Sequence, residues 1–400
     1  MSGKHKHASE AAYIVTNTNL GASRPEDYVA TSAQAIQDTG VKPWLETVGI
    51  DVKHAQRIDA ATPNFKDKSN AKNLDAVIEH SEAIAKVVEE QRRLGRLIIA
   101  TGGDHSMSLG TVAGIEAAAE GEVGMIIIDQ HLDFNTPETT PSGNIHGFPL
   151  AANTGQPGGE EQQRLANIYR KKSKLKASNT LVIGVSDTDP GELERALEAK
   201  VDVVTMDEID ERQRKLQFIF DKIDELRKRV GVVYVSIDMD GISQADVTGT
   251  PMPNSRGITA EEAMQILNYI RQEDEENTPE ESRRAPIVGV EVVELAPALD
   301  DGRSKRLAHE MIKEVMTWNQ AGTPIEISEP MPTPRQLHDQ IHSLLDHAVG
   351  NEKLWKEVDA VVAEADMIIH HKLRKISFVQ AVAALEKIKE RIEIMLHLAA

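Results

Sequence analysis

Residues 123–133 read Val-Gly-Met-Ile-Ile-Ile-Asp-Gln-His-Leu-Asp, an apolar run followed at once by two carboxylates and an imidazole. A run without polar alternation is typical of a strand that is buried on both faces of a parallel sheet. Similar runs occur at 97–100, 180–185, 201–204, 230–235 and 287–290. Helical periodicity is present around 75–94, 191–199, 207–229 and 259–272, and the last of these opens with the capping pattern Thr-Ala-Glu-Glu. The alternation of strands and helices predicts an α/β fold with a parallel sheet.

The amino-acid composition argues against several classes of function. The 400 residues include 45 Lys plus Arg and 64 Asp plus Glu, and the net charge is -19. This charge argues against binding to nucleic acid or to an anionic membrane, because both select basic surfaces. The absence of cysteine excludes disulfides, thiolate metal sites and cysteine nucleophiles. There is neither a membrane-spanning apolar run nor a secretory signal, so we expect a cytoplasmic protein.

The character of the chain changes after the proline-rich segment Glu329-Pro-Met-Pro-Thr-Pro334. We expect a disordered tail over 1–12, an α/β catalytic domain over 13–328 and a helical C-terminal extension over 335–400. Apolar residues spaced by three and four in the extension form the a/d seam of a short coiled coil: Phe378, Ala381, Leu385, Ile388, Ile392 and Met395. The seam packs either on its own chain or against a partner.

Four segments place acidic residues and histidines after predicted strands. They are Gly102-Gly-Asp-His105, Asp129-Gln-His-Leu-Asp133, Ser236-Ile-Asp-Met-Asp240 and Val293-Glu294. Ligands bind at the carboxyl ends of strands in open parallel sheets, and residues i and i+2 of an extended segment point the same way. So many acids would repel one another unless cations neutralised them. Oxygen and imidazole donors without sulfur suit Mn²⁺, Mg²⁺, Fe²⁺, Ni²⁺ or Zn²⁺, and their number suits a two-metal cluster.

These segments resemble the three signatures of the arginase–agmatinase (ureohydrolase) family, through about residues 95–320. The resemblance implies a three-layer α/β/α fold with a central, mainly parallel sheet and two Mn²⁺ ions, although Co²⁺, Ni²⁺ or Fe²⁺ would also accept these donors. It implies that one ion is held by His105, Asp129, Asp133 and Asp238. The other ion would be held by His131, Asp129, Asp238 and Asp240, so that Asp129 and Asp238 bridge the pair.

The loop after the second signature resembles the arginase loop more closely than that of agmatinases. The family likeness implies that Asn135, Ser142 and Asn144 receive the α-carboxylate of the substrate. The segment Ser186-Asp-Thr-Asp-Pro-Gly-Glu192 is similar to the arginase segment that meets the α-ammonium group, which implies that role for Asp189 and Glu192. On the residues alone, amides and hydroxyls suit a carboxylate, and two acids suit an ammonium.

The reaction implied is hydrolysis of L-arginine to L-ornithine and urea by a hydroxide that bridges the metals. Two divalent ions that share a water lower its pKa from about 15.7 towards 7. By resemblance, Asp133 orients the hydroxide and takes its proton, Glu294 pairs with the guanidinium, His146 shuttles a proton to the leaving amine, and Thr250 lines the site. A homo-oligomer, a trimer or a hexamer, is the family's usual assembly.

The chain departs from the family pattern in two places. The third signature runs into Ser243-Gln244 where relatives carry a further aspartate and a proline, and Ser186 stands where many arginases have arginine. Two alternatives therefore stay open. One is a ureohydrolase for another guanidino compound, such as agmatine, a guanidino acid or guanidine. The other is a metal-binding scaffold without activity.

Overall fold

The computed structural model describes residues 10–22, 28–169, 175–272 and 283–316, together with residues 341, 388, 389 and 392. The chain divides into two compact units, residues 1–320 and 321–400. The first unit contains an eight-stranded sheet in which every pairing is parallel. Among the described residues, no helix is both long enough and apolar enough to span a membrane.

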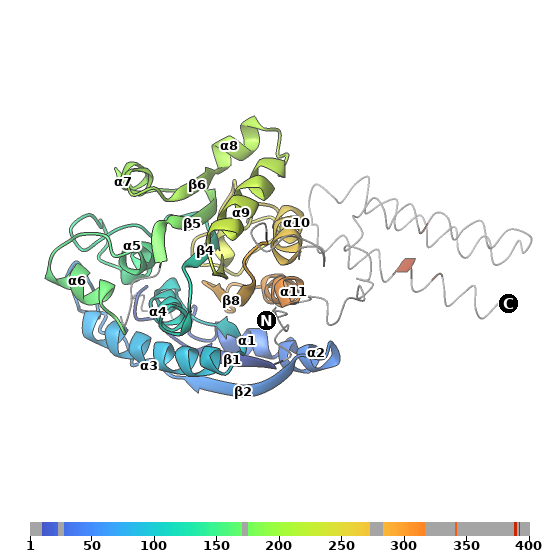
Figure 1. Ribbon diagram of the computed structural model, residues 1–400, viewed down its shortest axis with the longest axis horizontal. Helices are drawn as coiled ribbons and strands as arrows, with labels where there is room; N and C mark the ends of the chain where they lie inside the picture. Colours follow the sequence, from blue (N-terminus) through green and yellow to red (C-terminus); the bar gives the residue numbers. More distant parts are fainter. Residues whose placement is uncertain are drawn as a thin grey trace, which may run out of the picture. The chain divides into compact units, whose positions relative to one another are not determined.

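The sheet is the centre of the first unit (Figure 1). Its strands are β1 (Glu10–Thr16), β2 (Asp51–Ile58), β3 (Leu97–Thr101), β4 (Val123–Ile128), β5 (Leu175–Val185), β6 (Asp202–Thr205), β7 (Val232–Asp238) and β8 (Ile287–Val293). Their order in space is β2-β1-β3-β8-β7-β4-β5-β6. The four strands β3, β8, β7 and β4 are therefore consecutive neighbours in the middle of the sheet, although they are far apart in the sequence.

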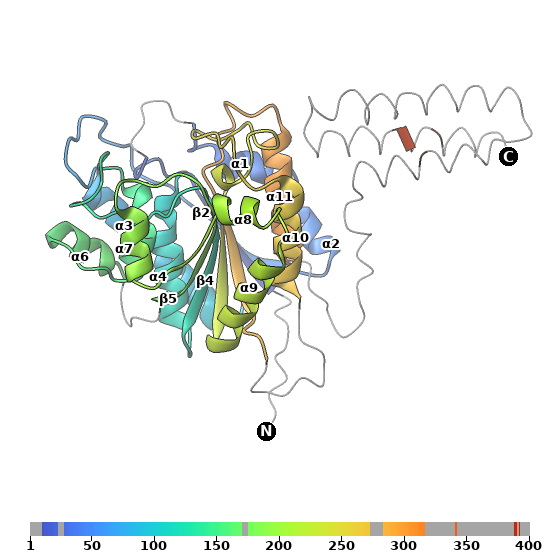
Figure 2. The same ribbon diagram turned by 90° about the horizontal axis from the view of Figure 1, so that it is seen from above.

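Helices cover both faces of the sheet, with α3 and α4 on one side and α9, α10 and α11 on the other (Figure 2). The helices are α1 (Ser32–Gln37), α2 (Val41–Thr47), α3 (Leu74–Arg93), α4 (Ser108–Ala118), α5 (Pro149–Asn153), α6 (Glu160–Ala166), α7 (Glu192–Glu198), α8 (Met206–Glu211), α9 (Gln217–Arg229), α10 (Ala260–Arg271) and α11 (Arg303–Met316). Three short 3-10 turns, η1 (His105–Met107), η2 (Ile145–Gly147) and η3 (Met239–Gly241), follow or lie near the strand ends. The predicted three-layer α/β/α fold is confirmed.

The central strands are apolar because both of their faces are covered. Every residue of β3, β4 and β8 is buried. The strand predicted for 230–235 starts later and continues to Asp238, so this acidic residue ends β7 rather than following it. The capping pattern before α10 is confirmed, since the Thr259 side chain accepts from the Glu262 backbone and Glu262 accepts from the Thr259 backbone.

Several elements differ from the sequence-based expectation. Strand β1 starts at Glu10, inside the segment assigned to a disordered tail over 1–12, and neither β1 nor β2 was predicted. Helix α4 was missed because ten of its eleven residues are buried, so it lacks the polar face that marks an amphipathic helix. The single helix expected over 207–229 is two helices, α8 and α9. They are separated by left-handed backbone at Gln213 and Arg214, with φ of 56° and 55°.

The helical extension predicted for 335–400 lies outside the described residues, apart from four single positions. Ile388 and Ile392, two members of the predicted seam, are helical and buried, and Ile341 is also buried. The proline-rich segment and residues 273–282 also lie outside the described part of the chain.

Candidate metal centre

The strand order brings the predicted metal ligands to one place. His105 begins η1 directly after β3, Asp129 follows β4, and Asp238 ends β7. Because β3, β8, β7 and β4 are neighbours and parallel, their carboxyl ends meet at one edge of the sheet. The acidic and histidine side chains of three distant segments therefore converge there.

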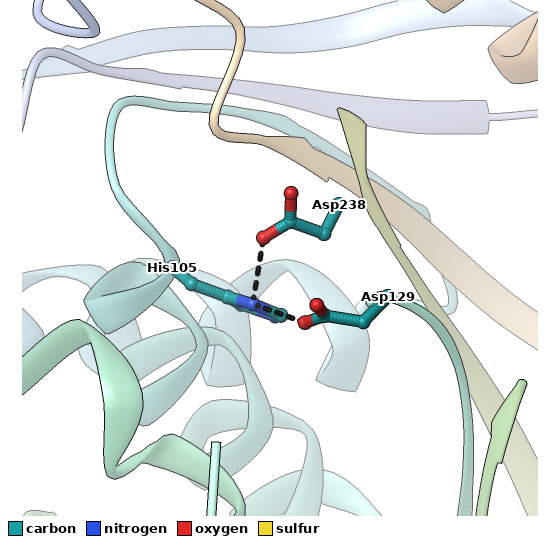
Figure 3. A group of neighbouring side chains, drawn as sticks. All are labelled: His105, Asp129 and Asp238. Atoms are coloured by element: carbon teal, nitrogen blue, oxygen red, sulfur yellow. Dashed lines mark ion pairs between the residues drawn. The ribbon is translucent and has the colours of Figure 1, made fainter. Parts of the chain in front are cut away.

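The first group of donors surrounds the His105 ring. Its Nδ1 lies 3.1 Å from Asp129 Oδ2, 2.9 Å from Asp133 Oδ2 and 3.1 Å from Asp238 Oδ2. Figure 3 shows the ring pointing toward the carboxylates of Asp129 and Asp238, with an ion pair drawn to each. Nδ1 is buried, yet its contacts lack hydrogen-bond geometry, so it has no hydrogen-bond partner among the described residues. Three oxygens gathered around one unpaired nitrogen are the arrangement expected of ligands that share a cation.

The second group lies next to the first and shares Asp129 with it. His131 Nδ1 is 3.5 Å from Asp129 Oδ1 and 3.4 Å from Asp240 Oδ2. The two oxygens of Asp129 thus face different histidines, which is the geometry of a bridging carboxylate. Asp238 directs Oδ2 to His105, while its Oδ1 accepts from the Asp240 backbone N–H at 2.8 Å. The donors fit a pair of divalent cations that share Asp129.

The pKa shifts of the aspartates in the cluster also indicate a site for cations. Burial and the charges of Asp240 and Asp129 raise the pKa of Asp238 well above its usual range. Burial and the charge of Asp129 also raise the pKa of Asp133. Burial would raise the pKa of Asp129 too, but its contacts with His105 and His131 outweigh that effect and lower it. Several buried carboxylates therefore repel one another here, and bound cations would relieve that repulsion.

A buried hydrogen-bond chain that we did not predict holds the His105 ring at Nε2. His105 Nε2 lies 3.1 Å from Ser236 Oγ, which donates to Glu291 Oε1 at 2.8 Å. The Glu291 carboxylate is fully buried and also accepts from the hydroxyls of Thr111, Tyr234 and Ser108. If Nε2 carries the proton, the Nδ1 lone pair is free for a metal. The sequence analysis ended this strand at residue 290, so Glu291 was not recognised as a charged residue within a buried strand.

Glu294 and His146 form a partly buried ion pair beside the cluster. His146 Nδ1 lies 3.0 Å from Glu294 Oε1, and the same oxygen accepts from the His105 backbone N–H at 2.9 Å. Burial disfavours protonation of His146, but the hydrogen bond and charge of Glu294 outweigh it and raise the His146 pKa. The pair borders a pocket whose other lining residues are Asn19, Ala22, Tyr28, Val29, Pro251 and Met252.

Two of these acidic residues have unusual backbone conformations. Asp133 has φ of 51° and Glu294 has φ of 55°, in the left-handed region that residues with a Cβ rarely adopt. The surrounding hydrogen bonds hold them there. The Glu294 backbone N–H donates to Gly103 O at 2.9 Å, and Asp133 O accepts from the Leu150 N–H at 3.1 Å. Such conformations cost about 1–3 kcal/mol each and are concentrated at functional sites.

The residues expected to bind substrate form a buried set around Asn135 and an exposed set around Ser142. Asn135 is buried, and its Nδ2 donates to Asp189 Oδ2 at 2.8 Å and to Glu192 Oε1 at 3.2 Å. Burial raises the pKa of Glu192 to about 7. Ser142 is exposed and accepts from the Asn144 backbone N–H at 3.1 Å. The Asn135 N–H donates to Gly147 O at 3.1 Å, which ties this loop to the turn that carries His146.

Thr250 is fully buried beside the turn that carries Glu294. The carbonyl oxygen of the preceding residue, Gly249, accepts from the Ala296 N–H at 2.7 Å. The two residues after Thr250 line the pocket with His146 and Glu294. Gln130, between Asp129 and His131, donates from Nε2 to Met252 O at 2.7 Å.

A parallel sheet with two adjoining carboxylate–histidine groups that could hold metal ions at its carboxyl edge has the features expected of the ureohydrolase class. A family model described as the arginase family matches residues 19–318. The chain is 35% identical over 299 residues to an arginase of Brevibacillus brevis, a match that covers 74% of this chain and 94% of the relative. It is 32% identical over 273 residues to an arginase of Bacillus subtilis, covering 68% of this chain and 86% of that one. The solved arginase structure from Bacillus caldovelox superposes with a TM-score of 0.68 at 29% identity, covering 78% of this chain and 99% of the other. The protein belongs to the arginase family.

Proposed function

We propose that the protein hydrolyses the guanidinium group of L-arginine to give L-ornithine and urea, with two Mn²⁺ ions as its cofactor. The observation that supports this most directly is the convergence of His105, His131 and four aspartates next to the Glu294–His146 pair. When bound, the two ions supply Lewis-acid activation of a water molecule. His105, Asp129, Asp133 and Asp238 would hold one ion, and His131, Asp129, Asp238 and Asp240 the other.

The residues of the chain position the substrate and move the protons. The Glu294 carboxylate matches the planar fork of a guanidinium. It would hold that group so that the guanidinium carbon faces the attacking oxygen. Asp133, whose Oδ2 faces the His105 ring, would orient the attacking water and accept its proton. His146 would carry a proton to the departing amine, and the raised pKa of its imidazole favours the protonated form that this step needs.

The far end of the substrate would meet the loop 135–144 and the start of α7. The hydroxyl of Ser142 and the amides of Asn135 and Asn144 suit a carboxylate, while Asp189 and Glu192 suit an ammonium group. Thr250 would line the site near the guanidinium. By the family resemblance we also propose a homo-oligomer, a trimer or a hexamer, that works in the cytoplasm.

Urea release by the Mn²⁺-loaded protein tests this proposal. Arginine is compared with agmatine, guanidino acids and guanidine under the same conditions, and bound metal is measured in parallel. We expect arginine to be the preferred substrate. A clear preference for another guanidino compound would mean that this compound, and not arginine, is the substrate. No urea release from any of the compounds would favour the scaffold alternative. The variant Asp133→Asn, with normal circular dichroism, is expected to lose about 10²–10⁴-fold in turnover, the usual contribution of a positioned acid–base group.

A further inference from the structure

Two cationic side chains contact the proposed substrate loop, and no role above uses them. Lys72 precedes α3, and its Nζ donates to Asn144 Oδ1 at 3.0 Å. Arg195 lies on α7, and its Nη2 donates to Asn135 Oδ1 at 3.0 Å. Each of the two asparagines expected to meet the carboxylate of the substrate therefore has its amide oxygen held by a cation.

The Lys72 contact decides which end of the Asn144 amide is free to bind an anion. A primary amide presents an acceptor oxygen at one end and two N–H donors at the other. Lys72 donates to the acceptor end of the Asn144 amide. No described residue accepts a hydrogen bond from Asn144 Nδ2. The backbone supports the same arrangement, because the Lys72 N–H donates to Gly143 O at 2.9 Å. The Asn144 amide is thus held with its donors available for an acceptor.

The Arg195 contact has a different consequence, because the Asn135 amide is already engaged. Its Nδ2 donates to Asp189 and Glu192, and its Oδ1 accepts from Thr139 Oγ1 at 3.0 Å as well as from Arg195. The guanidinium also donates from Nη1 to Pro190 O at 3.5 Å, and its buried Nε has no hydrogen-bond partner among the described residues. Arg195 therefore brings a positive charge to the loop and fixes the Asn135 amide.

The charge of the surroundings makes these two cations important. The four aspartates of the metal cluster, Glu294, Asp189 and Glu192 all carry carboxyl groups, and bound divalent ions would offset only the charge of the cluster. A carboxylate that approached this region without local cations would be repelled. We propose that Lys72 and Arg195 are positioning residues that make the site select guanidino substrates bearing a carboxylate over those that lack one. This inference rests on the proposed function and extends it to the substrate class.

The test uses the full-length, Mn²⁺-loaded protein and the variants Lys72→Met and Arg195→Met. Kinetics with arginine are combined with competitive inhibition by ornithine, which has a carboxylate, and by putrescine, which does not. Loss of one charge-assisted contact is expected to raise the KM for arginine and the Ki for ornithine by about tenfold or more. The Ki for putrescine and the kcat at saturating arginine are expected to stay within about threefold.

Matched controls separate this effect from a general change in charge or stability. Lys68→Met and Arg212→Met remove cations of the same kind at positions that make no contact with the two asparagines, and they are expected to leave both Ki values unchanged. The conservative variants Lys72→Arg and Arg195→Lys keep the charge and are expected to recover most of the affinity for ornithine.

Three results would overturn the inference. They are equal weakening of ornithine and putrescine, no weakening of either, and failure of the charge-retaining variants to recover ornithine binding. If the wild-type protein releases no urea from arginine, the proposed function fails instead. In that case, calorimetric binding of ornithine and putrescine to the same variants still decides whether Lys72 and Arg195 select a carboxylate.

Discussion

Replacing Gly103 with alanine is expected to disable the metal centre without unfolding the protein. Gly103 lies in the turn between β3 and His105, packed against the backbone of Thr18. A Cβ at this position would lie 1.6 Å from the Thr18 carbonyl oxygen and 2.7 Å from its carbonyl carbon. Real Cβ contacts are not shorter than 3.0 Å, so the two segments must separate by at least about 1.4 Å. The obstacle is backbone, so no change of side-chain rotamer relieves it.

Backbone hydrogen bonds would transmit this displacement both to the metal ligand His105 and to Glu294. The Asp104 N–H donates to Thr18 O at 3.1 Å, and Gly103 O accepts from the Glu294 N–H at 2.9 Å. Moving this turn therefore shifts His105 and Glu294 together. A misplacement of about 1 Å costs around 10²-fold in rate, so we expect kcat/KM to fall by at least about that factor.

Three measurements on the purified variant check this expectation: urea release with saturating Mn²⁺, bound metal per chain, and far-UV circular dichroism. Gly147→Ala is the matched control. Its Cβ would meet only Asp133 Oδ1, at 3.9 Å, an ordinary contact, so its activity is expected to stay within a few-fold of wild type. If Gly103→Ala keeps wild-type metal content and more than about a third of its activity, then the close packing of this turn does not position the site.

Three further predictions follow from the surroundings of the site. Ser236→Ala removes the contact of His105 Nε2 and is expected to weaken metal binding by about 10–100-fold, measured by competition with a chelator; unchanged affinity would contradict the hydrogen-bond chain. The pKa of buried His80 is lowered from 6.5 to about 4, so its neutral form stabilises the fold above pH 6.5. That stability, about 3 kcal/mol, is lost as pH falls towards 4, and urea denaturation of His80→Gln is expected to show a flatter pH profile than wild type. Finally, the raised pKa values of Asp133 and Asp238 mean that the metal-free fold binds protons that the unfolded chain releases. Above pH 6.5, where His80 is neutral in both the folded and the unfolded state, the melting temperature after chelation is therefore expected to fall as pH rises, whereas the Mn²⁺-loaded protein is expected to show no such fall.

The parts of the fold that could be predicted are those with a strong local pattern. The strands β3, β4 and, apart from Glu291, β8 are mainly apolar runs because they are covered on both faces. Strands β1 and β2 escaped detection for different reasons. Strand β2 lies at the edge of the sheet with alternating exposure and three charged residues, and β1 begins with Glu10, Ala11 and Ala12, residue types that are depleted in strands. Helix α4 is buried all round, so no amphipathic period marks it.

The candidate site shows the same division between local and long-range information. His105, Asp129 and Asp238 could be singled out because each stands at or just beyond the end of a buried run. The contacts of Ser236 with Glu291, of Lys72 with Asn144 and of Arg195 with Asn135 join residues that are 55 to 72 positions apart. No local pattern encodes such pairs, and sequence reasoning missed them.

The sequence by itself determined which side chains stand at the carboxyl ends of buried strands, because strand periodicity and the position of a strand end are local properties of the chain. Only the tertiary structure decided that β3, β8, β7 and β4 are neighbours and that one carboxylate, Asp129, faces two histidines. It also decided that Lys72 and Arg195 hold the amides of Asn144 and Asn135 in the proposed substrate loop. The physical reason is that strand order and side-chain contact depend on how helices and strands pack over long separations, which the residues near a motif do not specify.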